Sequence, residues 1–69
     1  MTEEEEAQPT PTYDIGERVI PKSGSHKGQV GRVVEQAWGN VSREWMYKVR
    51  FVRTTHIYYD NELRKGEVA

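Results

Sequence analysis

The stretch from Gly16 to Val34 constrains the fold most, because it has the pattern of a strand, a turn and a second strand. Val19 and Ile20 are β-branched, and such residues pack well on a pleated surface. Pro21 has no amide proton to give to a sheet ladder, so the first strand is predicted to end there or to run along an edge. The polar run 22–27 supplies the turn, with Gly24 free to adopt a positive φ.

Two glycines bracket the start of the second strand, which is predicted over residues 28–36. Gly28 and Gly31 occupy positions that often mark a bulge, a sharp bend or a close approach of two backbones. Val33 and Val34 continue the strand. A short sheet closes into a small barrel only where its strands curl, and these glycines favour such curling.

Residues 45–52 have the clearest strand pattern in the chain. Apolar and aromatic residues occupy every second position of this stretch, and they are predicted to face the core. This inward set is Trp45, Tyr47, Val49 and Phe51. A slip of one residue would exchange the two faces, so the register of this strand is well specified. The outward set is Met46, Lys48, Arg50 and Val52.

The remaining elements are shorter. A fourth strand is predicted over 56–59, with Ile57 and Tyr59 toward the core and His56 and Tyr58 on the other face. One helical turn over 60–63, capped by Asp60, precedes a last short strand within 64–68. The predicted core comprises Ile15, Val19, Val33, Trp45, Tyr47, Val49, Phe51, Ile57, Tyr59 and Leu63, with Tyr13 beside Ile15 at one end.

A chain of 69 residues is long enough for one small domain. Residues 1–12 contain four consecutive glutamates and two prolines, Pro9 and Pro11. We therefore predict a disordered acidic tail over 1–12, followed by the folded domain at 13–69. All ten Lys and Arg and the other seven acidic residues follow the tail, which makes the domain mildly basic. The tail either aids solubility or folds over a basic face.

Composition also narrows the function classes. The chain has no Cys, so disulfides and thiolate metal sites are excluded, and its two His lack metal-ligand spacing. No apolar run is long enough to cross a membrane and no signal peptide is visible, so a cytoplasmic location is expected. Ser, His and Asp side chains show no spacing that defines a catalytic triad, and the 22–28 loop does not match a phosphate-binding loop.

The glycine spacing resembles a known motif. The pattern resembles the KOW motif, which occurs in small SH3-like barrels of ribosomal proteins and transcription elongation factors. The matching residues are Gly16, Val19, Gly24, Lys27, Gly28, Gly31 and Val33. This resemblance implies an all-β, five-stranded SH3-like barrel. Because small barrels host many functions, it specifies the fold more than the activity.

The cations and aromatic residues of the domain favour a non-enzymatic binding module. Lys and Arg beside exposed aromatic rings suit nucleic acid, whose phosphates pair with cations and whose bases stack. The expected partner is nucleic acid or a protein of the transcription or translation machinery, with no cofactor and no metal. The same cations on an outer face also serve solubility. The predicted binding residues are Lys22, His26, Lys27, Trp38, Lys48, Arg50, His56 and Tyr58.

A second resemblance gives an alternative. Three segments are similar to the type II plasmid-borne dihydrofolate reductases, which are small barrels that form a homotetramer around one pore. These segments are 16–24, Gly28-Gln29 and His56-Ile57-Tyr58. This resemblance implies a nicotinamide cofactor (NADPH) and site residues His56, Ile57, Tyr58 and Lys22. His56 stands where that family has Gln, and Pro21 stands where it has a pore lysine.

A third reading is a protein-binding adaptor. In it, the edge near Pro21 or a pocket at Trp38 takes an extended peptide. Self-association is compatible with each reading, since a domain this small gains stability from it.

Overall fold

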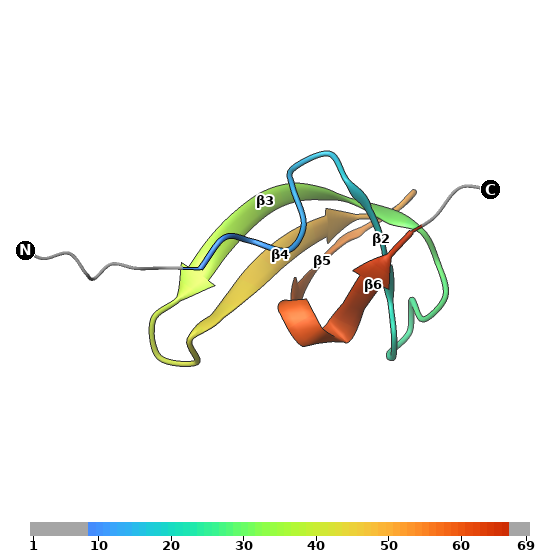
Figure 1. Ribbon diagram of the computed structural model, residues 1–69. Coiled ribbons are helices and arrows are strands. Elements are labelled where there is room, and N and C mark those ends of the chain that lie inside the picture. The colour runs from blue at the N-terminus through green and yellow to red at the C-terminus, as the bar shows by residue number, and fades with distance from the viewer. Residues whose placement is uncertain (1–8, 67–69) are drawn as a thin grey trace, which may run out of the picture.

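The computed structural model describes residues 9–66 as one antiparallel sheet of five strands (Figure 1). The all-β prediction is thereby confirmed. Residues 1–8 of the acidic tail predicted over 1–12, and residues 67–68 of the final strand predicted within 64–68, lie outside the described residues. The elements are β2 (Arg18–Pro21), β3 (Gly31–Gly39), β4 (Glu44–Arg50), β5 (Thr55–Tyr59), a 3₁₀ turn η1 (Asp60–Glu62) and β6 (Leu63–Lys65).

The strands are arranged in the order β5-β4-β3-β2-β6. Consecutive strands β2 to β5 therefore lie side by side, and the chain then crosses from one edge of the sheet to the other through η1. This crossing puts β6 next to β2, with Pro21 opposite Leu63. Strand β2 thus lies inside the sheet, and it ends at Pro21 as the missing amide proton predicts.

The loop between β2 and β3 is made of tight turns. Gly24 and Gly28 have φ values of 90° and 83°, which side chains other than glycine rarely adopt. The amide of Lys27 donates to the Gly24 carbonyl at 3.2 Å, and the amide of Gly28 donates to the Pro21 carbonyl at 3.2 Å. These bonds hold the chain in the loop, so β3 begins at Gly31, later than the predicted Gly28.

Strand β3 is bent by a bulge next to Val34. Val33 lies opposite Val49, but Glu35 is the next residue in register, opposite Lys48. A bulge adds one residue to a strand, bends it and increases its twist. Figure 1 shows β3 curving over the neighbouring strands. The predicted bend is therefore present, but the bulge falls at Val34 and not at a glycine.

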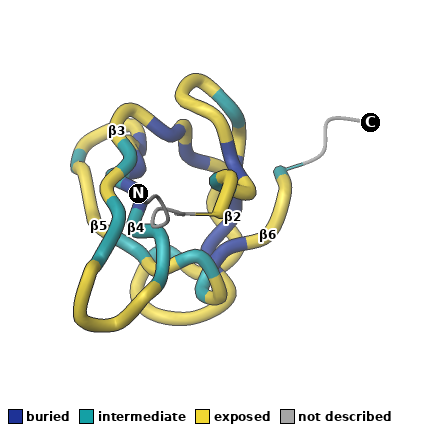
Figure 2. The backbone as a smooth tube through the Cα atoms, turned by 60° about the vertical axis from the view of Figure 1, so that its left-hand side comes forward, coloured by how far each residue is buried: buried dark blue, intermediate teal, exposed yellow. Residues whose placement is uncertain are grey.

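The core lies on the inner side of this curved sheet (Figure 2). In β4 the predicted alternation is confirmed, since Tyr47 and Val49 are fully buried and Arg50 is exposed. Trp45 is half-buried and packs against the core. The buried cluster consists of Tyr13, Val19, Val33, Tyr47, Val49, Phe51 and Leu63.

The predicted orientation of β5 is wrong. Ile57 is 65% exposed and Tyr59 40% exposed, whereas Tyr58 packs against the core. The pairing with β4 explains this, because Ile57 lies opposite the outward Lys48 and Tyr58 lies opposite the inward Tyr47. The turn after β4 determines this phase through the amide of Phe51, which donates to the Thr54 carbonyl at 2.7 Å.

Two further expectations need correction. Ile15 is 62% exposed, because it lies in a turn in which the amide of Glu17 donates to the Asp14 carbonyl at 3.0 Å. Tyr13 takes the core position instead. At η1 the capping residue is Tyr59 and not Asp60, and the Tyr59 amide donates to Glu62 Oε1 at 2.9 Å.

One buried hydroxyl connects three parts of the chain. Tyr47 Oη accepts the amide proton of Thr12 at 3.0 Å and donates to Asp60 Oδ2 at 3.0 Å. Tyr13 packs edge-on against Tyr47, and its own hydroxyl donates to the Leu63 carbonyl at 3.0 Å. Burial is the main cause that raises the pKa of Tyr47 above its ordinary value.

We predict that Gly31→Ala destabilises the domain by about 1–3 kcal/mol through overpacking. A Cβ at Gly31 would lie 2.8 Å from Phe51 Cε1 and would collide with Val49 Cγ1. Urea unfolding of the variant measures this loss. Gly24→Ala is the control, because a Cβ there meets open space and the cost is limited to backbone strain. Equal stability of Gly31→Ala and the wild type would contradict the close packing.

We also predict that Tyr47→Phe costs about 1–3 kcal/mol at neutral pH, because the Thr12 amide and the Asp60 carboxylate lose their hydrogen bonds to the hydroxyl. The pKa of Tyr47 is higher in the folded protein than in the unfolded chain, where it is near 10. The resulting contribution to stability is fully present at pH values below the unfolded pKa, and it is lost as the pH rises through the folded pKa. The variant should therefore lose stability less steeply above pH 10 than the wild type. Thermal unfolding as a function of pH tests both effects, and parallel curves would contradict the second.

Candidate functional site

Three arginines from three neighbouring strands form a row on the outer face of the sheet. Arg18 of β2 lies directly opposite Arg32 of β3, and Arg32 lies directly opposite Arg50 of β4. All three are exposed, and each adjoins a fully or almost fully buried valine of the same strand. Residues directly opposite in an antiparallel pair have Cβ atoms about 5 Å apart. We call Arg18, Arg32 and Arg50 the arginine row.

The acidic residues near the row are engaged elsewhere. Glu17 Oε1 accepts the Asp14 amide at 2.9 Å, and its Oε2 lies 3.4 Å from Lys65 Nζ. The Asp14 bond is the largest cause that lowers the pKa of Glu17. Glu35 lies 3.0 Å from Lys48 Nζ. These are the ion pairs found among residues 9–66, so no carboxylate of that range neutralises the row.

An open groove follows the row. It has a volume of about 460 Å³ and is lined by the three arginines together with Phe51 and three valines. The valines are unusually exposed, at 51% for Val30, 36% for Val34 and 96% for Val52. A second hollow of about 320 Å³ continues from Arg50 past Arg53 to Thr54 and Thr55. Guanidinium donors therefore stand beside apolar surface and hydroxyl groups, which is a combination suited to an anionic ligand.

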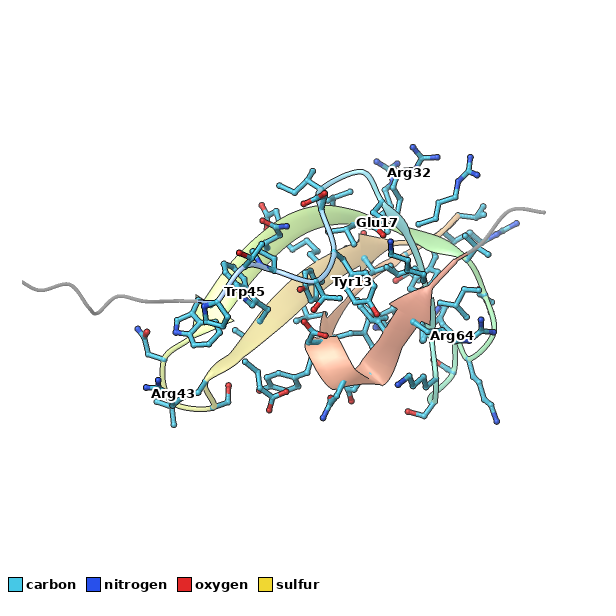
Figure 3. The ribbon with its side chains drawn as sticks, in the orientation of Figure 1. Tyr13, Glu17, Arg32, Arg43, Trp45 and Arg64 are labelled. Atoms are coloured by element: carbon cyan, nitrogen blue, oxygen red, sulfur yellow. The ribbon has the colours of Figure 1, made fainter. Side chains whose placement is uncertain are left out.

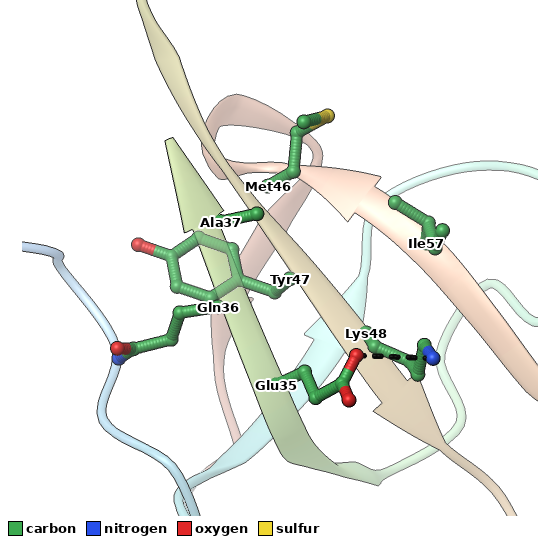
Figure 4. Close-up of a pocket in the computed structure, with 7 residues that line it drawn as sticks. All are labelled: Glu35, Gln36, Ala37, Met46, Tyr47, Lys48 and Ile57. Carbon is green, nitrogen blue, oxygen red and sulfur yellow. Dashed lines mark ion pairs between the residues drawn. The ribbon is translucent and has the colours of Figure 1, made fainter. Parts of the chain in front are cut away.

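Lys48, a predicted binding residue, lies farther along the outer face. Its ammonium is paired with Glu35, and both side chains are substantially exposed, so the pair contributes little to stability. The two flank a shallow pocket of about 100 Å³ (Figure 4). Ala37, Met46 and Ile57 supply its apolar lining. This pocket is smaller and less charged than the groove along the arginine row.

The structure brings His26, His56 and Tyr58 together around Phe51. The His26 ring stacks on Phe51 with centroids 4.4 Å apart, and the His26 and His56 centroids are 4.5 Å apart. Tyr58 meets Phe51 edge-on at 6.2 Å. The two histidines are thus neighbours in space although they are distant in sequence. Their rings pack on the end of the core and hold the 22–28 loop against the sheet.

Trp38 lies in β3, which extends to Gly39 and so runs beyond the end predicted at residue 36. It is the register partner of Trp45, and the two rings meet edge-on with centroids 5.6 Å apart. Both are half-buried and lie on the inner side, and Trp38 is six residues along β3 from Arg32. The arrangement separates the tryptophans from the arginine row, and Phe51, the aromatic residue that lines the groove, is buried.

Sequence reasoning therefore found only part of this site. Lys22 and Lys27 are exposed in the loop, and Arg50 belongs to the row. In the sequence, Arg18 and Arg32 are visible only as part of the basic charge of the domain. Their signal was a recurring pair of a core valine and an outward arginine in each of the first three strands, which becomes a row only once the strand register is known.

Among residues 9–66 no three His, Cys, Asp or Glu side chains gather in a way that would hold a metal ion. The same part of the chain contains no helix with the length and apolar character needed to cross a membrane. Comparison with protein-family models, with curated proteins and with solved structures finds no match for this chain.

We predict that Arg32→Gln leaves the stability unchanged or raises it by a few tenths of a kcal/mol, because like charges directly opposite on a sheet destabilise it. The gain should shrink as salt screens the repulsion. Thermal unfolding at low and high salt measures both effects. Arg43→Gln is the control, since Arg43 lies in the β3–β4 turn at the far end of the sheet (Figure 3). A loss of stability above about 1 kcal/mol in Arg32→Gln would show that the row is a structural element.

Proposed function

We propose that this protein is a small SH3-like barrel that binds the phosphate backbone of nucleic acid through the arginine row. The barrel is supported by the strand order β5-β4-β3-β2-β6, by the bulge that bends β3 and by the 3₁₀ turn before β6. The single observation that carries the function is the alignment of three exposed arginines with no neutralising carboxylate among residues 9–66.

The proposal explains why the row persists despite its repulsion. Like charges opposite one another cost stability in the free protein, and an anion placed over them removes that cost. Arginine presents planar, fork-like donors that match phosphate oxygens. Arg53 and the hydroxyl groups of Thr54 and Thr55 lie farther along the same side, where they extend the contact beyond the row.

The arrangement favours binding without sequence preference. Phosphate contacts position a protein on nucleic acid but carry no base information. The aromatic residues that the sequence predicts for base stacking are engaged with other rings, because Tyr58 packs on Phe51 and Trp38 packs on Trp45. A contact limited to phosphates is mainly electrostatic, so affinity should fall strongly with salt.

We predict that the protein binds a labelled single-stranded DNA of mixed sequence with a Kd on the order of 10⁻⁵ M at low salt. Three phosphate contacts give a slope of about −2 for log K against log salt, and Arg32→Gln should reduce that slope by about 0.7. Fluorescence anisotropy measures both quantities.

The matched control is Arg43→Gln, which removes the same charge at the far end of the sheet (Figure 3). It should change affinity far less than Arg32→Gln. Equal losses in the two variants would reduce the interaction to net charge and contradict the row. Binding that depends on Lys22 and Lys27 but not on Arg32 would move the site to the loop.

A reductase of the type II kind is the second candidate. The observation that favours it is the position of Ile57, which is 65% exposed on the edge strand β5 between His56 and Tyr58. An exposed isoleucine on an edge strand suits a contact between subunits around a shared pore. That reading requires a tetramer and NADPH-dependent reduction of dihydrofolate, so the mass in solution separates it from a monomeric binding module.

A further inference from the structure

The entering segment of the chain lies against an aromatic site on the inner side of the sheet. We define the aromatic site as Gln36 and Trp38 of β3 with Trp45 and Tyr47 of β4. Figure 3 shows Trp45 beside the entering segment, with Tyr13 farther along it. Residues 9–12 precede the first strand and have no regular secondary structure, and we call them the arm.

The aromatic site holds this segment by its backbone. The indole Nε1–H of Trp45 donates to the Pro9 carbonyl at 2.7 Å. Tyr47 Oη accepts the Thr12 amide proton at 3.0 Å, and Gln36 Nε2 donates to the Tyr13 carbonyl at 2.6 Å. Each bond joins a side chain of the sheet to a main-chain group of the segment. The site therefore contacts this segment through two main-chain carbonyls and one main-chain amide.

The sequence of the arm is Pro-Thr-Pro-Thr. Proline fixes φ and keeps the residue before it extended, so such a segment loses little entropy when it binds. Aromatic surfaces with a hydrogen-bond donor are a common way to recognise extended proline segments. The Trp38 and Trp45 rings, edge-on at 5.6 Å and both half-buried, supply such a surface.

The arm is held far less firmly than the residue that follows it. Pro9, Thr10 and Thr12 are exposed, whereas Tyr13 is 5% exposed and donates its hydroxyl proton to the Leu63 carbonyl. The arm can thus leave the sheet while Tyr13 stays in the core, since exposed segments with few contacts open at low cost. Its departure would free the Trp45 indole donor, which is bonded to the Pro9 carbonyl.

We propose that the aromatic site is a docking site for an extended, proline-containing segment of a partner protein, and that the arm is the resident occupant which this segment displaces. The chemistry of the occupant follows from the arm itself, which shows what the site accepts. The inference is independent of the arginine row, which lies on the outer face of the sheet.

The test uses the full chain and two peptides with blocked ends, Pro-Thr-Pro-Thr and Ala-Thr-Ala-Thr. The two tryptophans give two indole N–H signals in an NMR spectrum, and Trp45→Phe assigns the one that belongs to Trp45. The arm competes with added peptide at a high effective concentration, so a variant with a loosened arm, Pro9→Ala with Pro11→Ala, should bind the proline peptide about tenfold more tightly than the wild type.

Three results are expected together. The proline peptide shifts the Trp45 indole signal of the loosened-arm variant, the alanine peptide shifts it far less, and Trp45→Phe weakens binding while the sheet amides keep their positions. Thr10→Ala is the matched control, since Thr10 is exposed, and it should bind like the wild type.

Two results would overturn the proposal. If the proline peptide leaves the Trp45 indole signal of the loosened-arm variant unchanged while the sheet spectrum is intact, the arm is a purely structural element. A signal that changes with protein concentration in the absence of peptide would show that the arm of a second copy is the occupant. Arg32→Gln should leave peptide binding unchanged, so failure here and failure of nucleic-acid binding are distinguishable.

Discussion

The hydroxyl of Tyr47 is the constraint on which the arrangement of the chain depends. A tyrosine that is fully buried must find hydrogen-bond partners for its hydroxyl, because an unsatisfied polar group in the core is costly. The partners come from the entering segment at Thr12 and from η1 at Asp60. The interior strand β4 thus holds the segment before β2 and the turn that leads into β6.

The site on the outer face follows from this arrangement. Because η1 returns the chain to β2, β6 covers what would otherwise be an open edge, and β2 is held in register with β3. That register aligns Arg18 with Arg32, while the hairpin of β3 and β4 aligns Arg32 with Arg50. The bulge at Val34 then exposes apolar surface beside the row, as bulges often do next to functional sites.

The two sides of the sheet carry different chemistry. The bulge at Val34 shifts the alternation along β3 by one residue, so Arg32 points outward whereas Gln36 and Trp38 point inward. The outer side presents fixed positive charge, whereas the inner side near the tryptophans presents hydrogen-bonding groups that read a backbone. The proposed anion and peptide ligands would therefore bind at separate places, and either site can be altered without the other.

Strong local patterns in the sequence determined much of the fold. The unbroken alternation in β4 specified which face is buried, the missing amide proton of Pro21 ended β2, and Gly24 took the positive φ that its turn demands. The residues of β5 could not be assigned in this way, because His, Ile, Tyr and Tyr are amphipathic in either phase and the turn at Phe51 and Thr54 decided between them. The same reason limits the site. Charge and aromatic content were visible in the sequence, but the arginine row, the histidine pair on Phe51 and the seating of the arm on Trp45 exist only once strands are paired in register, since residues from different strands become neighbours through tertiary contacts alone.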